Sequence, residues 1–336
     1  MSSLNLANHA RLSCAPMMDW TDRHCRYLHR LLCRNVLLYT EMVTAPALVR
    51  GGALHLLGFD PREHPVALQL GGSDPSELAK AAQLGAEAGY DEINLNVGCP
   101  SDRVQSGAFG AVLMLNPTLV ADCVSAMRDA VDVDVTVKCR IGVDDQNPEE
   151  TLPAFLDTMQ AAGCRRVIIH ARKAWLQGLS PKENRDVPPL DYDLVLRMKQ
   201  AFPELHLSIN GGVTSLKQAD GFLQAGMDGV MIGRAAYHDP ASILCAADRI
   251  VYDTPADTTP FDAVRRMIPY IDAHLASGGK LHQVTRHMLG LFAGRPGARV
   301  WRRTLSEGAH KPGAGSALVR QALAQVPVPE SVMKAG

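Results

Sequence analysis

The sequence has no apolar run approaching the roughly 18 residues that a membrane span requires. Its first 12 residues lack the basic start and the long apolar stretch of a secretory signal. Its eight cysteines include no Cys-x-x-Cys pair, so a structural zinc site is not expected. We therefore expect a cytoplasmic protein without membrane contact or bound metal, whose cysteines stay reduced and are mostly buried as small apolar side chains.

Two nucleotide-binding signatures are missing as well. No Gly-x-Gly-x-x-Gly turn follows an early strand, and the sequence contains no P-loop. The first absence argues against a doubly wound open sheet, which is the main rival architecture for a chain that alternates strands and helices.

Short apolar or β-branched segments alternate with helical patterns instead. Asp74, Asn116, Asn147 and Asp239 each precede a proline, which is typical of a helix start. Eight strand–helix units in about 240 residues match a (β/α)8 TIM barrel, which usually has roughly 250 residues. The predicted strands are 12–15, 36–39, 66–70, 92–96, 133–138, 166–170, 206–209 and 229–232.

The pattern changes after Asp253. Residues 254–260 are rich in Thr, Pro and Asp, as in a linker, and only helical patterns follow. This predicts a barrel domain over 1–253 and a small all-helical domain over 254–336. The apolar positions of its three expected helices are Val264, Met267, Ile268, Ile271 and Leu275, then Leu281, Val284, Met288 and Leu291, then Ala298, Trp301 and Leu305.

Charge is unevenly distributed along the chain. Residues 261–336 carry 11 Lys and Arg against 4 Asp and Glu, whereas the other 260 residues carry 23 against 31. A basic tail suggests a polyanionic partner, although a solvated helical surface explains the charge equally well. Arg295, Arg299 and Arg303 recur at i,i+4 spacing with Arg302 alongside, which predicts one cationic helix face.

The carboxyl ends of the predicted strands should form the active site of such a barrel. Gly211 and Gly212 follow the seventh strand, and Gly233 and Arg234 follow the eighth, where barrels often bind phosphate. Glycine lets backbone N–H groups approach an anion closely, and arginine adds a bidentate charge. A Gly-Gly turn alone is weak evidence, but two such loops after adjacent strands favour a phosphate site.

Other strand ends carry side chains that would suit a flavin. Lys138 and His170 end neighbouring strands, and a cation near flavin N1 favours the reduced cofactor. The alternatives are a lysine that extends to solvent at the barrel rim and an internally bonded histidine. Gln69 could pair with the pyrimidine edge of the flavin. Cys99 lies between Gly98 and Pro100 after the fourth strand, which places it on the catalytic face.

These segments resemble the tRNA-dihydrouridine synthases, and most closely their A subfamily, from residue 15 to about residue 310. The Asn-x-Gly-Cys-Pro-Ser loop within 94–103 is highly specific for the family. His-Ala-Arg-Lys from His170 and Lys-Glu-Asn-Arg from Lys182 indicate the subfamily. Residues 15–22, 39–42, 69–72 and 286–292 also match.

The resemblance implies bound FMN, transient NADPH, and reduction of the C5–C6 bond of D-loop uridines in tRNA at positions 20 and 20a. Hydride would pass from reduced FMN N5 to C6 of a uridine taken out of its stack. Cys99 would protonate C5, since a free thiol with a pKa of about 8.5 is mostly neutral at pH 7. Which of the two positions, which tRNAs, and NADPH rather than NADH stay open.

The resemblance also implies the remaining site residues. The catalytic acid is Cys99, and the implied FMN contacts are Pro16, Met17, Met18, Gln69, Lys138, His170, Asn210, Gly211, Gly212, Gly233 and Arg234. Asn96 would hold the uracil, and the implied tRNA contacts are Arg172, Lys182, Arg185, Arg299 and Arg302.

Two other functions are compatible with parts of the pattern. A flavin barrel that acts on a free small molecule would not need a basic helical domain. An RNA-binding protein with a relic barrel would not need intact phosphate loops or Cys99. We therefore expect an enzyme with tRNA as its partner; no stable protein partner is implied, and a monomer is expected.

Overall fold

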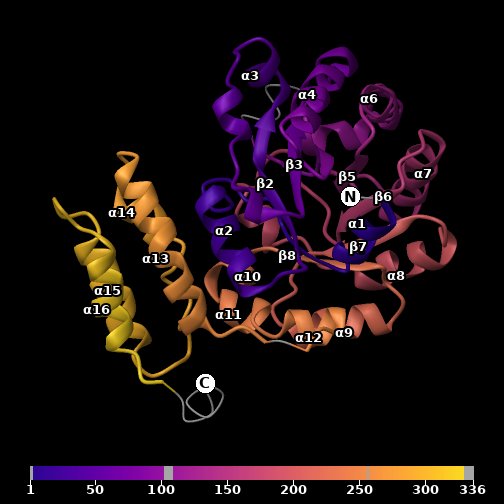
Figure 1. Cartoon of the computed structure of the whole chain (residues 1–336). Helices are drawn as coiled ribbons and strands as arrows, with labels where there is room; N and C mark the ends of the chain where they lie inside the picture. Colours follow the sequence, from indigo (N-terminus) through magenta and orange to yellow (C-terminus); the bar gives the residue numbers. More distant parts are fainter. Residues whose placement is uncertain (1–2, 102–108, 256, 329–336) are drawn as a thin grey trace. The chain divides into compact units, whose positions relative to one another are not determined.

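The structure is a computed structural model, and it describes residues 3–101, 109–255 and 257–328 (Figure 1). Contacts between Cα atoms divide the chain into two compact units, 1–23 with 35–233 and 24–34 with 234–336. The barrel lies in the first unit. The helices after β8 belong to the second unit. The predicted domain boundary between residues 253 and 254 stays a proposal.

Eight parallel strands close into a barrel in the order of the sequence, which confirms the predicted architecture. Each strand pairs with the next, and β8 pairs with β1 through Leu12–Val230 and Cys14–Ile232. All eight strands overlap the predicted segments. Their bounds are β1 Leu12–Cys14, β2 Leu37–Thr44, β3 Val66–Gly71, β4 Glu92–Val97, β5 Asp134–Arg140, β6 Arg166–His170, β7 His206–Asn210 and β8 Gly229–Ile232.

Helices surround these strands and begin as the sequence predicts. Asp74, Asn116 and Asn147 accept hydrogen bonds from backbone N–H groups in the first turn of α4, α6 and α7. The first unit contains α1 Ser3–His9, α3 Ala45–Val49, α4 Pro75–Glu87, α6 Pro117–Ala130, α7 Pro148–Ala161, α8 Tyr192–Ala201, α9 Leu216–Gln224 and the 3-10 helices η1 Leu54–Leu57, η2 Pro61–Glu63, η3 Gly110–Leu115 and η4 Glu183–Arg185.

Helices and the turns between them make up the described residues of the second unit, which include no strand. It contains most of α2 Arg23–Leu32, with α10 Arg234–His238, α11 Pro240–Leu244, α12 Ala247–Tyr252, α13 Pro260–Ala276, α14 Leu281–Thr285, α15 Ala298–Gly308 and α16 Ser316–Ala324. Its core includes the rings of Phe261, Phe292 and Trp301, whose centroids lie 5.0 Å apart in each contact.

The first and third predicted helices of this unit are confirmed, but the second was expected to be longer. Its helix ends at Thr285, and Met288 and Leu291 lie in the turns that follow. Both are fully buried there. The Trp301 indole N–H donates to the Met288 carbonyl at 2.9 Å. Tertiary packing thus satisfies a backbone group that a continuing helix would otherwise have bonded.

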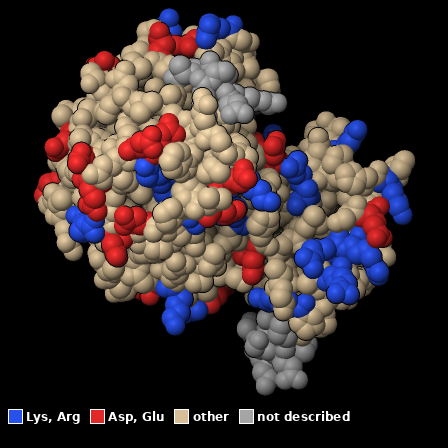
Figure 2. Space-filling view, turned by 180° about the vertical axis from the view of Figure 1, so that it is seen from behind, with Lys and Arg blue, Asp and Glu red and all other residues tan. Residues whose placement is uncertain are grey.

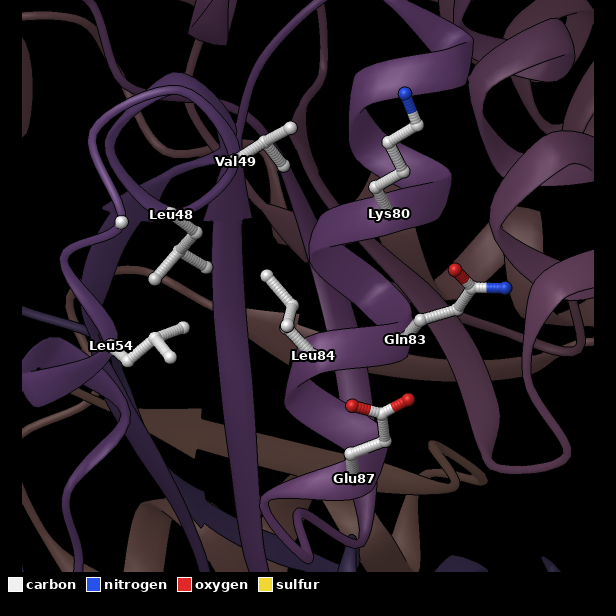
Figure 3. Close-up of a pocket in the computed structure, with 8 residues that line it drawn as sticks. Leu48, Val49, Leu54, Lys80, Gln83, Leu84 and Glu87 are labelled. Carbon is white, nitrogen blue, oxygen red and sulfur yellow. The ribbon is translucent and has the colours of Figure 1, made fainter.

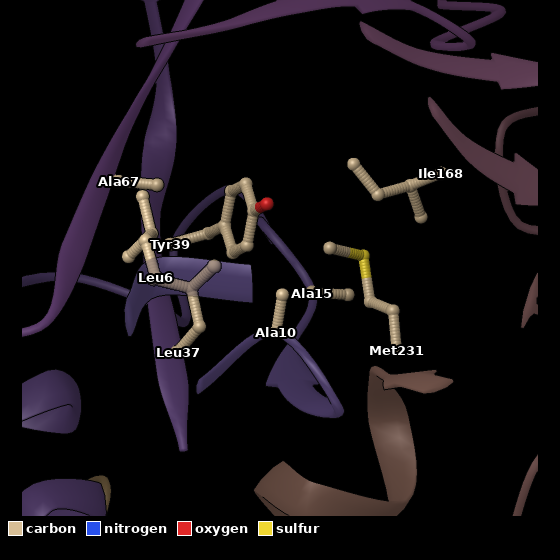
Figure 4. Close-up of a cluster of buried hydrophobic side chains, with 8 residues drawn as sticks. All are labelled: Leu6, Ala10, Ala15, Leu37, Tyr39, Ala67, Ile168 and Met231. Atoms are coloured by element: carbon tan, nitrogen blue, oxygen red, sulfur yellow. The ribbon is translucent and has the colours of Figure 1, made fainter. Parts of the chain in front are cut away.

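The barrel interior is apolar around a polar column. Leu6 and Ala10, from α1 and the turn after it, pack with Leu37, Tyr39 and other inward side chains (Figure 4). Glu92 begins β4 within this interior and is fully buried. Its carboxylate accepts from Arg166, from Thr136 and, at 2.7 Å, from the Tyr39 hydroxyl.

We predict that Arg166→Met destabilises the protein by about 3–5 kcal/mol, because the Glu92 charge would stay buried without its counter-ion. Arg197→Met is the matched control, because the Arg197–Glu149 pair is half exposed and should contribute at most about 1 kcal/mol. Urea unfolding of both variants measures the difference, and equal small losses would contradict it.

Candidate active site

A chain of side-chain amides runs up the inside of β3 and β4. Gln69 Nε2 donates to Asn94 Oδ1 at 2.8 Å, and Asn96 Nδ2 donates to Gln69 Oε1 at 2.9 Å. Asn94 Nδ2 donates in turn to Thr136 Oγ1 at 2.8 Å. Since alternate strand residues share a face, Glu92, Asn94 and Asn96 all point inward. The column therefore extends from the buried ion pair to the carboxyl end of β4.

Asn96 holds the loop that carries Cys99. Its Oδ1 accepts from the backbone nitrogens of Gly98 and Cys99 at 3.1 and 3.0 Å. Cys99 and Cys245 are half-buried, whereas the other six cysteines are buried, and all eight are free thiols. The Cys99 thiol donates to Ser101 Oγ at 3.6 Å. Residues 102 and 103 of the matched loop lie outside the described residues.

A half-buried lysine lies at the end of the next strand. Lys138 Nζ donates to Asn210 Oδ1 at 2.9 Å, and Asn210 Nδ2 donates to the Met231 carbonyl at 2.8 Å. Burial, together with the positive charge of Arg140, lowers the pKa of Lys138 to about 8. Cys99 is close enough to interact with Lys138 electrostatically. In the described part of the chain no carboxylate pairs with Lys138, so this cation is available to an anionic ligand.

The loop after β7 brings backbone close to the barrel mouth. Gly211 and Gly212 have φ values of +108° and +68°, which favour glycine. A Cβ atom on Gly211 would lie 2.5 Å from Cδ2 of His170. The Tyr192 hydroxyl donates to the Gly211 carbonyl at 2.7 Å. A side chain is therefore excluded here, which suits close approach of a ligand to the backbone.

The loops after β8 and β1 meet beside this turn. A Cβ atom on Gly233 would lie 3.5 Å from the Met17 sulfur. Met17 N donates to Thr21 Oγ1 at 2.9 Å, whereas the Met18 side chain is exposed. Pro16 precedes them in the same loop, and Arg234 begins α10 in the second unit.

The side chain of Asn184 anchors the loop after β6, residues 171–188, through hydrogen bonds. This side chain is fully buried, accepts from Trp175 N at 2.8 Å, and donates to the carbonyls of Trp175 and Leu179 at 2.9 and 3.1 Å. The loop carries Arg172, Lys182 and Arg185, the residues expected to contact RNA.

The cationic face of α15 differs in part from the prediction. Arg299, Arg302 and Arg303 are exposed on the helix, whereas Arg295 lies in the turn before it. The helix begins only after Gly297, whose φ of +84° interrupts the i,i+4 series. Figure 2 shows Lys and Arg side chains gathered on one part of the helical unit.

The sequence analysis assigned no role to Arg140. Arg140 is buried on β5, and among the described residues its guanidinium donates only to backbone carbonyls: Gly98, Lys173 and Asn184. Asn94, Thr136 and Asn184 were also not assigned. The alternation of polar residues along β4 and β5 was the available signal, because residues two apart share a face.

A separate groove of about 400 Å³ lies between α3, η1 and α4 (Figure 3). Its lining residues are Leu48, Val49, Gly52, Leu54, Lys80, Gln83, Leu84 and Glu87. None of the predicted site residues lines it. Within the described residues, no helix is long and apolar enough to cross a membrane, and no cluster of three potential metal ligands occurs.

Comparison with known proteins gives a consistent family. A family model described as dihydrouridine synthase matches residues 13–326. The chain is 57% identical over 320 residues to the tRNA-dihydrouridine(20/20a) synthase of Shewanella oneidensis, which covers 94% of this chain and 93% of that relative. It is 60% identical over 317 residues to the Escherichia coli K12 protein of the same name, covering 93% and 90%.

The fold is also similar to a solved structure of an old yellow enzyme homologue from Zymomonas mobilis. The TM-score is 0.52 at 12% identity, and the match covers 74% of this chain and 90% of that chain. At this identity the likeness concerns the barrel fold alone.

We predict that Lys138→Met raises the melting temperature of the cofactor-free protein at pH 7 by about 2–4 °C, because burial of the charge is no longer required. The folded-state pKa of about 8 lies below that of an unfolded lysine, so the gain is full below pH 8. It declines as the pH rises further, because wild-type Lys138 then loses its proton on folding.

The control is Lys80→Met, since Lys80 is exposed on α4. Thermal unfolding at pH 7 and pH 10 compares both variants with wild type. A gain at Lys138 that is independent of pH would show that its charge is not the cause.

Proposed function

The chain belongs to the dihydrouridine synthase family, and on that premise we propose that it reduces D-loop uridines of tRNA with FMN and NADPH. The family was identified from the sequence motifs, and the comparisons confirm it. The proposed product is 5,6-dihydrouridine at positions 20 and 20a, which are the positions in the names of the two relatives.

One observation carries the proposal. A half-buried thiol lies within electrostatic range of a half-buried lysine that has no carboxylate partner among the described residues. A proton donor beside a cation suits a reaction in which negative charge develops on the substrate and must be quenched by a proton.

The residues at the strand ends fit FMN. Lys138 would face the electron-rich pyrimidine part of the flavin, and Gln69 retains one N–H and one lone pair beyond its bonds to Asn94 and Asn96. Gly211, Gly212 and Gly233, with Arg234, would hold the phosphate. His170 and the Pro16–Met18 loop would complete the FMN site. When bound, FMN in its reduced form would supply the hydride for C6 of the uracil, and NADPH would return the oxidised flavin to the reduced form.

Cys99 would supply the proton for C5. Asn96 keeps the Cys99 backbone in place and retains one N–H for a uracil carbonyl, because its other polar positions are already bonded. The thiol acts as a neutral acid, so the proposal requires no separate base to activate it.

Basic residues in both units would bind tRNA. Arg172, Lys182 and Arg185 lie in the loop after β6, and Arg299 and Arg302 are exposed on α15. Contacts of these side chains with phosphates would give an affinity that falls as salt rises. An enzyme for a small free substrate would not need the α15 surface.

We predict that tRNA from cells lacking the gene contains uridine in place of dihydrouridine at position 20, at 20a or at both. The gene on a plasmid should restore the modification, and the purified protein should carry FMN and be yellow. Primer extension after alkaline cleavage, or mass spectrometry of D-loop fragments, locates the base. Unchanged D-loops would reject the substrate, and a protein that cannot be reconstituted with FMN would reject the chemistry.

A further inference from the structure

Arg140 holds the peptide that precedes the Cys99 side chain. Its Nε donates to the Gly98 carbonyl at 3.1 Å, while Asn96 Oδ1 accepts from the N–H of Cys99 at 3.0 Å. These two groups belong to the same peptide unit, which is planar. Two anchors on opposite edges of that plane restrict its rotation, and this limits the directions open to the Cys99 Cα–Cβ bond.

The same guanidinium also holds the loop after β6. Nη1 donates to the Lys173 carbonyl at 3.0 Å and to the Asn184 carbonyl at 2.9 Å. These acceptors lie near the two ends of the segment that carries Arg172, Lys182 and Arg185. One side chain therefore joins the loop of the proposed acid to the loop of the proposed RNA contacts.

In this position, Arg140 lowers the stability of the folded protein. It is 2% exposed, and no carboxylate is within bonding reach of it among the described residues. Burial, together with the positive charges of Arg185 and Arg172 and against the opposing effect of Cys99, lowers its pKa to about 10. Burying a cation that is bonded only to carbonyls is unfavourable in free energy. Fixing a loop does not by itself require a buried charge, which favours a functional reason for its presence.

We propose that Arg140 is a positioning residue that orients Cys99 and couples it to the loop of residues 171–188, so that RNA bound to this loop steadies the acid. The proposal rests on the proposed function, in which Cys99 is the proton donor. Lysine cannot replace arginine in this role, because the three N–H groups of an ammonium start from a single nitrogen, whereas the planar guanidinium donates from the separated atoms Nε and Nη1.

The test compares Arg140→Ala and Arg140→Lys in the FMN-loaded enzyme with tRNA. We expect kcat to fall about 10- to 100-fold in both variants, because a small misplacement of a catalytic group has an effect of this order. KM for tRNA should change by a smaller factor than kcat, because Arg140 holds the loop of residues 171–188 without being one of its proposed RNA contacts. FMN content should not change, because Arg140 is not among the proposed FMN contacts. Guanidinium ion should partly restore kcat in Arg140→Ala.

Arg128→Ala is the matched control. Arg128 also donates to a backbone carbonyl, that of Ala162 at 2.8 Å, but it is exposed on α6. This variant should retain wild-type kcat and show no response to guanidinium.

Hydrogen exchange gives a readout that needs no turnover. In Arg140→Ala, peptides covering 96–101 and 171–188 should both exchange faster, although the substitution lies in neither. Asn184→Ala, which loosens the second loop directly, should speed exchange at 96–101 only while Arg140 is present. Faster exchange in one loop alone, or equal effects of Asn184→Ala in both backgrounds, would overturn the coupling.

Cys99→Ala separates this inference from the proposed function. If Cys99→Ala keeps full turnover, the assignment of the acid fails whatever Arg140 does. If Cys99→Ala is inactive but both Arg140 variants keep wild-type kcat, only the inference about Arg140 fails.

Discussion

The position of Cys99 depends on one buried amide, the side chain of Asn96. Its oxygen holds two backbone N–H groups of the Cys99 loop, and its nitrogen is held by Gln69. Gln69 is bonded to Asn94, Asn94 to Thr136, and Thr136 to the Glu92 carboxylate. A buried polar network of this kind is rigid when every member is bonded and costly when one is missing. The barrel interior thus supports the catalytic face through hydrogen bonds as well as apolar packing.

The same face contains cations that weaken the fold. Lys138 and Arg140 end β5 on the same side of the strand, and burial lowers the pKa of each. Active sites often retain such groups because an anionic ligand or a developing negative charge compensates them. Here the two cations have different tasks: Lys138 is available to a ligand, whereas Arg140 is bonded to three carbonyls of the protein.

Much of this organisation could be predicted from the sequence, because its strongest signals are local. Apolar periodicity located all eight strands, and the barrel rule then placed Lys138, His170 and Cys99 at one end of them. The helical unit was harder to predict. The stripe through Met288 and Leu291 is equally compatible with buried turns, which a distant indole stabilises.

The role of Arg140 was not predictable for a similar reason. Its partners are the backbone carbonyls of Gly98, Lys173 and Asn184, and each of these residues lies far from Arg140 in the sequence. Every residue has a backbone carbonyl, so no sequence motif identifies these partners.

The central claim is that Cys99 delivers the proton that completes uracil reduction, and separate half-reactions of Cys99→Ala test it most directly. Reduction of the bound flavin by NADPH should proceed at the wild-type rate in the variant. Oxidation of the reduced variant by tRNA, followed by stopped-flow absorbance, should be slower by at least about 100-fold, a loss typical of a missing general acid. Oxidation by tRNA at the wild-type rate would show that the proton comes from another group.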